Sequence, residues 1–162
     1  MNKSYLLIGG NVGNRQEFLL QAAGFITAKA GTVARSSAIY ETAAWGKTDQ
    51  AAFLNQALEL HTHLDAAPLM EILLHIEEQM GRRRGEKYGP RVIDIDVLLY
   101  NEAVIHTPLL NVPHPELANR RFALEPLNEL APTYFHPLLK KTIRQLLEEC
   151  TDPLPVKKFS PQ

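Results

Sequence analysis

Cysteine is nearly absent from this chain of 162 residues, since Cys150 is the only one. A single cysteine can form neither an internal disulfide nor a zinc site built from several thiolates, and this usage is typical of a reducing cytosol. Long apolar runs are missing too. The opening residues lack the apolar stretch of a secretory signal, and no run approaches the roughly 18 apolar residues of a membrane span. We therefore expect a cytoplasmic protein without a membrane segment.

An excess of positive charge is also missing. The chain has 17 Lys and Arg against 18 Asp and Glu, so its net charge of −1 indicates neither a nucleic acid nor a membrane surface as partner. Any site for a polyanion must be local. No heptad pattern or long apolar edge predicts a partner chain, and a monomer is the default expectation.

What the sequence does contain is a regular order of apolar patterns. With 45% hydrophobic residues, the chain is long enough for one domain with a core and too short for two comfortable ones. Strand patterns and amphipathic helix patterns occur in the order β-α-β-β-α-β, which predicts an α+β fold with a ferredoxin-like core. Helices should then cover one face of an antiparallel-type sheet. The strands are expected over residues 5–9, 33–42, 53–63 and 91–100, and the helices over residues 14–31 and 65–81.

The rest of the chain adds less regular elements. Two further helices are expected, over about residues 115–124 and residues 143–149. We expect the single catalytic domain to span residues 1–150. Residues 151–162 are rich in proline and charge, so we expect them to form a mobile tail.

Two acids stand among apolar residues in the last predicted strand. The segment GPRVIDIDVLLY, residues 89–100, includes Asp94 and Asp96. An unpaired buried carboxylate costs several kcal/mol, so both acids need partners. Side chains two apart on a strand share a face, which should place Asp94, Asp96 and Tyr100 on one side and Leu99 on the other. The two carboxylates suit a hard cation such as Mg²⁺. The alternative is a solvated strand end at which both pair with arginines.

Cationic residues come directly before this strand, in GRRRGEKYGPR, residues 81–91. Guanidinium groups bind phosphate oxygens bidentately, so this run beside two acids favours a metal-bound polyphosphate as ligand. The alternative is a solvated, charged loop. The cations are Arg82, Arg83, Arg84, Lys87 and Arg91.

Other candidates are less specific when each is taken alone. His114 lies between two prolines, and it could donate to a phosphate or simply be a turn residue. Arg120 has the same two interpretations. Phe53, Asn55 and Phe122 together could form an aromatic slot with an amide, suited to a flat heterocycle. From spacing alone, core packing is the better account of each phenylalanine.

In combination these motifs resemble a known family, 6-hydroxymethyl-7,8-dihydropterin pyrophosphokinase (HPPK) of folate biosynthesis. The most specific element is Gly81-Arg82-x-Arg84 followed by Gly89-Pro90-Arg91-x-Ile93-Asp94-Ile95-Asp96. Shorter segments match in the same order, and the resemblance covers about residues 4–150. These segments are Ile8-Gly9-x-Asn11, Tyr40-x-Thr42, Phe53-Leu54-Asn55, Val112-Pro113-His114 and Asn119-Arg120-x-Phe122.

The resemblance implies an HPPK-like α/β/α arrangement and a reaction that moves pyrophosphate from ATP to 6-hydroxymethyl-7,8-dihydropterin and releases AMP. It implies that Asp94 and Asp96 bind two Mg²⁺ ions, while Arg82 and Arg91 assist the transfer. The ATP-binding residues that it implies are Glu77, Arg84, Tyr88, His114 and Arg120. The pterin-binding residues that it implies are Phe53 and Phe122 on the ring faces, Asn55 at the polar edge, and backbone groups near Thr42 and Trp45.

Two other classes of protein would use part of the same set. A metal-dependent phosphohydrolase needs the acids and arginines but directs water at the phosphate, and a non-catalytic nucleotide-binding module of ferredoxin-like fold needs no transfer chemistry. Neither needs Phe53, Asn55 and Phe122 together. The pyrophosphokinase interpretation is therefore preferred.

Overall fold

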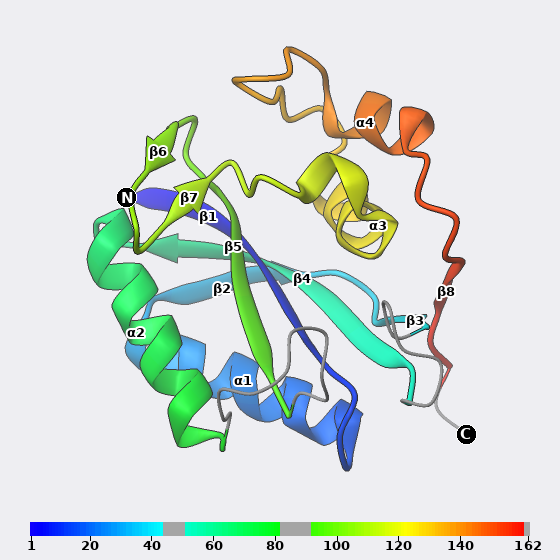
Figure 1. Ribbon diagram of the computed structural model, residues 1–162. Coiled ribbons are helices and arrows are strands. Elements are labelled where there is room, and N and C mark those ends of the chain that lie inside the picture. The colour runs from blue at the N-terminus through cyan, green and yellow to red at the C-terminus, as the bar shows by residue number, and fades with distance from the viewer. Residues whose placement is uncertain (44–50, 82–91, 161–162) are drawn as a thin grey trace.

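The computed structural model of the chain describes residues 1–43, 51–81 and 92–160 and is drawn in Figure 1. Among the helices of these ranges, none has the length and apolar content that crossing a membrane requires. The strands are β1 (Asn2–Gly10), β2 (Thr32–Ser36), β3 (Tyr40–Thr42), β4 (Phe53–Thr62), β5 (Asp94–Tyr100), β6 (Ile105–His106), β7 (Asn111–Val112) and β8 (Val156–Lys158). The helices are α1 (Arg15–Lys29), α2 (Ala66–Gln79), a short 3-10 helix (Leu117–Asn119), α3 (Arg121–Leu130) and α4 (Ile143–Glu149).

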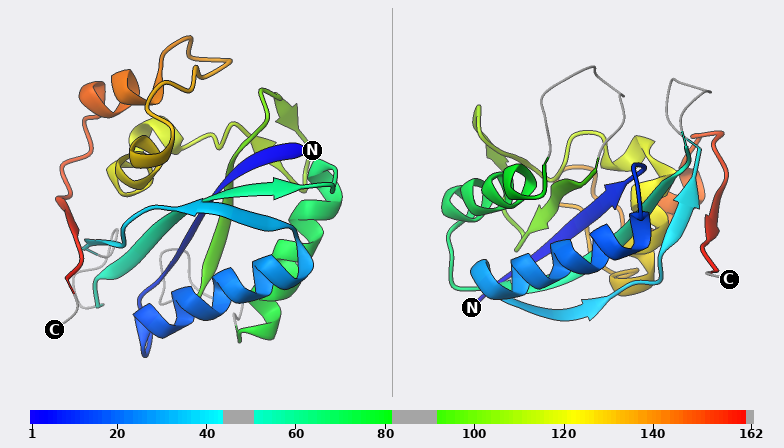
Figure 2. Two further views of the ribbon diagram at one scale, coloured as in Figure 1. Left: turned by 180° about the vertical axis from the view of Figure 1, so that it is seen from behind. Right: turned by 90° about the horizontal axis from the view of Figure 1, so that it is seen from below.

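The main sheet is antiparallel and has the strand order β5-β1-β4-β3-β8. β2 pairs with β4 along the same edge as β3, farther from the start of β4. α1 and α2 cover one face of the sheet, and α3 and α4 lie on the other (Figures 1 and 2). A β-α-β-β-α-β chain with β1 between β4 and β5 is the ferredoxin-like arrangement, so the predicted fold class is confirmed. α3 and α4 supply the third layer.

Each face of the sheet has its own apolar core. Along β1, Leu6 and Ile8 pack toward α1 and α2, whereas Tyr5 and Leu7 pack toward α3. This is the period of two that a strand imposes on its side chains. Because both faces of β1 are covered, the strand is a nearly continuous apolar run instead of an alternating one.

A β-bulge in β5 changes the face of its last residues. β5 carries one extra residue, Leu98, relative to β1. Leu98 and Leu99 both pack on the α3 side, and Tyr100 turns to the side of α1 and α2. The predicted faces of Leu99 and Tyr100 are therefore wrong, because the extra residue shifts the alternation from that point on.

The strand predicted over residues 33–42 is divided into β2 and β3 by Ser37. The N–H of Ser37 donates to the carbonyl oxygen of Ala57 at 2.9 Å, and its hydroxyl oxygen accepts the N–H of Ala57 at 2.9 Å. A side-chain oxygen thus takes the place of a backbone carbonyl in the ladder. Such local bonds compete with regular pairing, which explains the break.

The helix predicted over about residues 115–124 begins and ends later, as α3. Arg120 has an extended backbone, with φ −125° and ψ 101°, so the helix cannot start before it. It then continues through Pro126, although a proline inside a helix removes one hydrogen bond. The buried side chains of Leu127 and Leu130 extend the apolar stripe beyond the proline, and their packing explains the longer helix.

The structure also differs from the mobile tail predicted for residues 151–162. Val156–Lys158 pairs antiparallel with β3 and forms β8. Asp152 is buried, and its two carboxylate oxygens accept the N–H groups of Arg121 at 3.1 Å and of Leu154 at 3.0 Å. Pro153 and Pro155, which precede β8, have no N–H to donate, but Val156–Lys158 pairs as a short edge strand.

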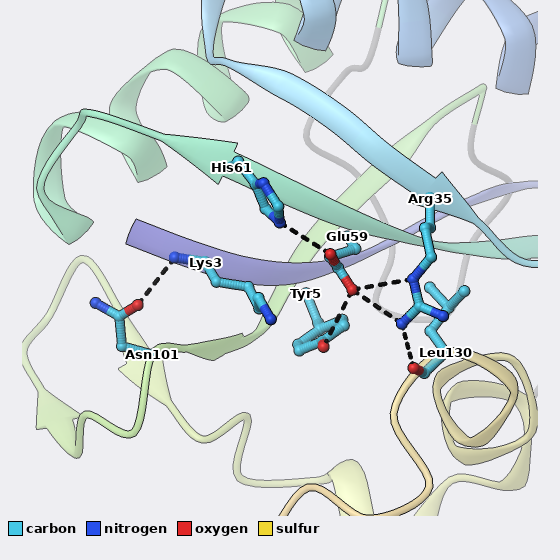
Figure 3. A network of polar contacts seen from close by, with 7 residues as sticks. All are labelled: Lys3, Tyr5, Arg35, Glu59, His61, Asn101 and Leu130. Carbon is cyan, nitrogen blue, oxygen red and sulfur yellow. Dashed lines mark hydrogen bonds and ion pairs between the residues drawn. The ribbon is translucent and has the colours of Figure 1, made fainter. Parts of the chain in front are cut away.

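A buried carboxylate ties three strands to the end of α3 (Figure 3). Glu59 on β4 is 6% exposed and accepts hydrogen bonds from Tyr5 at 3.3 Å, Arg35 at 2.9 Å and His61 at 2.8 Å. Arg35 also donates to the carbonyl oxygen of Leu130. Burial alone would raise the pKa of Glu59, but the bonds from Arg35 and His61 outweigh burial and lower it. The ionised carboxylate thus fixes how α3 sits on the sheet.

The role of Asp152 can be tested by mutation. Asp152→Ala should lower the free energy of unfolding by about 1–3 kcal/mol, because the N–H groups of Arg121 and Leu154 lose their acceptor. Urea denaturation followed by circular dichroism measures this change. As a matched control, Asp65 is the N-cap of α2 and makes no side-chain capping bond within the described residues. Asp65→Ala should therefore cost less, and equal losses in the two variants would contradict the role given to Asp152.

Candidate functional site

The central strand β1 brings two distant candidates to either side of Gly9. In the two antiparallel ladders, Gly9 pairs with Asn55 on β4 and with Asp94 on β5. Residues that are opposite in a ladder point to the same face. That face is the α3 side, because Leu7, two residues from Gly9 on β1, belongs to the core beside α3. Asn55, Gly9 and Asp94 therefore form one row across the sheet.

The absence of a side chain at Gly9 is a steric requirement of this row. A Cβ added at Gly9 would lie 2.2 Å from Asn55 Oδ1 and 3.0 Å from the carbonyl oxygen of Leu54. The side chain of Asn55, which is 5% exposed, therefore lies over the backbone of β1. In the sequence, Gly9 is only one position of a motif, and its steric role is not evident. A glycine inside a strand often marks a place where another group approaches the backbone closely, and this signal could have indicated the contact with Asn55.

Asp94 and Asp96 extend the row along β5. Asp96 pairs with Leu7, so it shares the α3-side face with Asp94, and both side chains are half-buried. Two carboxylates at this spacing suit Mg²⁺, which takes oxygen ligands and usually keeps waters or phosphate oxygens among them. Among the residues described, no group of three or more His, Cys, Asp and Glu side chains forms a metal cluster. Two carboxylates leave most ligand positions of a Mg²⁺ ion open, so they fit a cation whose other ligands come from water or a substrate.

The β-bulge connects His114 to this face. The carbonyl oxygen of Leu98, the extra residue of β5, accepts the backbone N–H of His114 at 2.9 Å. The imidazole Nδ1 of His114 accepts the backbone N–H of Glu116 at 3.1 Å. A ring nitrogen that accepts an N–H carries no proton of its own, so the proton of the neutral ring is on Nε2. The ring can therefore donate one hydrogen bond from Nε2.

The surroundings of His114 favour this neutral form. Burial lowers the pKa of the imidazole, and the guanidinium of Arg120 lowers it further, while the carboxylates of Glu116 and Asp94 act in the opposite direction. Charges influence one another in this way only when they are near. The structure thus brings His114, Arg120 and Asp94 together at one end of the sheet.

The two aromatic candidates come from β4 and α3. Phe53 is two residues from Asn55 on β4 and shares its face, and α3, which carries Phe122 in its first turn, packs against β4. Both rings are half-buried, so part of each remains open. The guanidinium carbon of Arg120 lies 5.7 Å from the ring centre of Phe122. Half-burial beside an amide and a guanidinium fits a binding slot better than core packing.

Two other candidates are engaged in the fold itself. The hydroxyl of Thr42 donates to the carbonyl oxygen of Pro155 at 3.1 Å, so this side chain holds the segment before β8. Glu77 on α2 is buried, and its Oε2 accepts the backbone N–H of Ile95 at 2.6 Å. The side chain of Glu77 therefore reaches β5 between the two aspartates.

The remaining candidates lie outside the described residues, so their predicted roles stay predictions. They are Trp45, Arg82, Arg84, Tyr88 and Arg91. The description resumes at Ala51, just before β4, and at Val92, just before β5. Ala51 and Val92, the described residues that follow these two segments, therefore lie beside the candidate site.

A separate cavity of about 540 Å³ lies toward the other end of β1. Lys3 and Tyr5 contribute to its wall from β1, Asn101 follows β5, and Tyr134 follows α3. None of the candidates from the sequence lines it. This cavity is therefore distinct from the row of Asn55, Gly9 and Asp94 at the other end of the strand.

The sequence matches known proteins over most of its length. A family model described as 7,8-dihydro-6-hydroxymethylpterin-pyrophosphokinase (HPPK) matches residues 5–132. A 2-amino-4-hydroxy-6-hydroxymethyldihydropteridine pyrophosphokinase from Bacillus subtilis (strain 168) is 43% identical over 130 residues, which cover 80% of this chain and 78% of the relative. A protein of the same name from Aquifex aeolicus (strain VF5) is 40% identical over 147 residues, or 91% of each chain.

Solved structures with a similar fold also exist. The structure of Plasmodium falciparum HPPK-DHPS, wild type with pteroate, has a TM-score of 0.75 at 19% identity and covers 91% of this chain. The same wild-type protein with SDX-DHP gives a TM-score of 0.72 at 19% identity. This chain spans 42% and 43% of those longer chains. At such low identity the likeness concerns the fold.

The steric requirement at Gly9 gives a direct prediction. Gly9→Ala should displace the Asn55 side chain and lower the free energy of unfolding by about 1–3 kcal/mol, because the new methyl group overpacks a buried site. Chemical denaturation measures the loss, and the side-chain amide resonances of Asn55 report the displacement. Gly24, exposed in α1 with nothing within 4 Å of an added Cβ, is the control. Gly24→Ala should stabilise by about 0.5–1 kcal/mol; a similar gain at Gly9 would exclude the close approach.

The lowered pKa of His114 predicts how stability depends on pH. The imidazole binds a proton more readily in the unfolded chain than in the folded one. Its contribution to the free energy of unfolding is therefore fully present above about pH 6.5, and it is lost as the pH falls from there through the lower pKa of the folded state. His114→Asn, which keeps an acceptor near the Nδ1 position, should reduce the loss of stability between pH 7 and about pH 5. Urea midpoints at several pH values measure the slope. The pKa of buried His136 is lowered too, so His136→Asn is the matched comparison. If stability falls with pH as steeply in His114→Asn as in the wild type, the lowered pKa of His114 is disproved.

Proposed function

The chain belongs to the 7,8-dihydro-6-hydroxymethylpterin-pyrophosphokinase family, and on this premise we propose that its active site is the Gly9 end of β1, β4 and β5 on the α3 side. Its activity is the family's reaction in folate biosynthesis, transfer of pyrophosphate from ATP to 6-hydroxymethyl-7,8-dihydropterin. The observation that carries the location is the row of Asn55, Gly9 and Asp94. This row brings an amide suited to a heterocycle next to a carboxylate suited to a phosphate-bound cation.

The reaction determines what the site must do. The hydroxymethyl oxygen of the pterin attacks the β-phosphorus of ATP, the bond from that phosphorus to the bridging oxygen of the α-phosphate breaks, and AMP leaves with that oxygen. The hydroxyl proton is released. Such a transfer depends on in-line placement and on neutralisation of phosphate charge more than on an unusual nucleophile. The site therefore needs a holder for each substrate and a source of positive charge between them.

Asp94 and Asp96 fit Mg²⁺ by their chemistry, since both are half-buried carboxylates on one face of β5. We assign them as the protein ligands of two Mg²⁺ ions, with the remaining ligands coming from water and ATP. Bound there, the metal supplies positive charge for the phosphates and lowers the barrier to loss of the hydroxyl proton. The task of the two side chains is to hold that charge beside the row of Asn55, Gly9 and Asp94.

His114 and Arg120 are assigned to ATP. Neutral His114 carries its proton on Nε2, as its Nδ1 bond to Glu116 requires, so it can donate to a phosphate oxygen without adding charge. Arg120 adds a fixed positive charge and a planar group near Phe122. We propose that Arg84 and Tyr88 also bind ATP and that Arg82 and Arg91 assist the transfer. These four side chains belong to the segment that precedes Asp94 in the sequence.

Phe53, Asn55 and Phe122 are assigned to the pterin. Aromatic rings prefer the faces of a flat heterocycle, and an amide both donates and accepts, as the polar edge of a pterin requires. The half-burial of both rings and the placement of Asn55 over Gly9 support this assignment. Backbone groups near Thr42 and Trp45 complete the proposed pterin edge. The side chain of Thr42 is buried and donates its hydroxyl hydrogen to Pro155, so we assign the backbone of Thr42 and not its side chain to the pterin.

We propose that the protein is a cytoplasmic monomer. The single cysteine fits a reducing cytosol, and the near-neutral net charge argues against nucleic acid or a membrane surface as partner. A monomer is the default because the sequence has no heptad pattern or long apolar edge that predicts a partner chain.

A product assay tests the proposal. The protein is mixed with ATP, Mg²⁺ and 6-hydroxymethyl-7,8-dihydropterin, and the nucleotides are separated. AMP should form only when the pterin is present. Asp96→Ala should lower kcat at least about 100-fold, because it removes a ligand of the Mg²⁺ ions whose positive charge stabilises the transfer. Phe122→Ala should act on the pterin instead and raise its KM about tenfold.

The control and the contrary outcomes are equally specific. Asp65→Ala removes a carboxylate from the start of α2 and should leave kcat and both KM values unchanged. Release of ADP and phosphate would indicate a phosphohydrolase or an ordinary kinase. ATP binding without turnover would leave a non-catalytic nucleotide-binding module. An active Asp96→Ala variant would refute the metal assignment.

A further inference from the structure

The strand that carries both aspartates is at the edge of the sheet. β5 pairs with β1 on one side, and no other strand of the described chain pairs with its outer side. In an antiparallel ladder, alternate residues direct their N–H groups to opposite sides of the strand. Ile95 donates its N–H to Glu77 on α2, so the N–H groups of Asp94 and Asp96 are directed toward β1. The outward N–H between the two aspartates is thus bound by a carboxylate.

This carboxylate is an unusual choice for a structural acceptor. Glu77 is 3% exposed, and its Oε2 lies 2.6 Å from the backbone nitrogen of Ile95. Burial of an ionised carboxylate is costly unless hydrogen bonds compensate, and bonds between an N–H and a charged oxygen are among the strong ones in proteins. Neighbouring Glu78, by contrast, is exposed. The helix therefore directs one of two successive glutamates into the interior and onto β5.

We propose that Glu77 is a positioning residue that holds β5 at Ile95 and thereby sets the geometry in which Asp94 and Asp96 bind the divalent cation. The inference rests on the metal assignment of the proposed function. It replaces the ATP contact implied by the family resemblance, because a side chain as buried as Glu77 has almost no surface for a nucleotide. Removal of a group that orients a metal ligand without contacting the metal typically weakens metal affinity about 10- to 100-fold.

Two substitutions separate the effect of the length of the Glu77 side chain from the effect of its charge. Glu77→Gln keeps the length of the side chain and an acceptor oxygen for the N–H of Ile95, but it removes the charge. Glu77→Asp keeps the charge, but it is one methylene shorter and draws the acceptor away from β5. If Glu77 acts by holding β5, Gln should preserve its function and Asp should not. If it acts by charge or by direct contact with metal or nucleotide, the order should be reversed.

The experiment uses the full chain and two measurements. Hydrogen exchange of the Ile95 amide, followed by NMR without metal, reports the bond itself. Binding of Mn²⁺, followed by its electron paramagnetic resonance signal in the presence of an ATP analogue with a methylene bridge between the α- and β-phosphates, reports the metal site without turnover. Glu78→Ala is the matched control, since it removes an exposed carboxylate from the same turn of α2.

Glu77→Asp should speed exchange of the Ile95 amide about tenfold and weaken Mn²⁺ binding about 10- to 100-fold. Glu77→Gln should change both by less than about threefold, and Glu78→Ala should change neither. The inference is overturned if Gln weakens Mn²⁺ binding while the Ile95 amide stays protected. It is also overturned if Asp exposes the amide and leaves Mn²⁺ affinity unchanged.

Failure of the metal assignment itself would look different. If the wild-type protein binds Mn²⁺ no more tightly than Asp96→Ala, the site is not at Asp94 and Asp96, whatever the Glu77 variants do. If wild type and Asp96→Ala differ but the Glu77 variants match wild type, the metal site stands and the positioning role of Glu77 is refuted.

Discussion

The pairing of β1 with both β4 and β5 is the constraint on which the rest of the structure depends. Its register places Asn55 and Asp94 on either side of Gly9 and directs all three to the α3 side. A slip of one residue in either ladder would turn the amide or the carboxylates into the opposite core. That core, beside α1 and α2, is filled by apolar side chains, so it penalises such a slip strongly. The apolar core thus enforces the geometry of the polar site.

Periodicity predicts the parts of the fold that depend on single segments. The order of strands and helices, and with it the ferredoxin-like core, follows from apolar patterns that each segment carries in its own sequence. The β-bulge at Leu98 is different, because its carbonyl is used by His114, which is distant in sequence. Likewise, β8 forms because β3 offers an edge to pair with, and nothing within Val156–Lys158 shows that. Such features belong to pairs of segments, which a pattern along one segment cannot reveal.

The candidate site shows the same division. Residue types and spacing identify Asp94 and Asp96 because acids are rare in apolar strands. They do not reveal the steric role of Gly9 or the bond of Thr42 to Pro155, since each depends on a neighbour brought in by the sheet. For Phe53 and Phe122, spacing alone favours the core, whereas the structure leaves both rings half-open. Burial is a property of the whole fold, and it separates a slot from a core only once the fold is known.

β8 has a consequence beyond its place in the sheet. An open edge of a β-sheet is a template on which another chain can add a strand, and proteins avoid such self-assembly with short, charged edge strands. β8 has three residues, two of which are the exposed Lys157 and Lys158, and it covers β3, which would otherwise be an edge. Toward the other edge, the N–H of Ile95 is bound by Glu77. The short, charged β8 therefore protects the β3 side of the sheet against self-assembly, and at β5 a side chain occupies an outward N–H group.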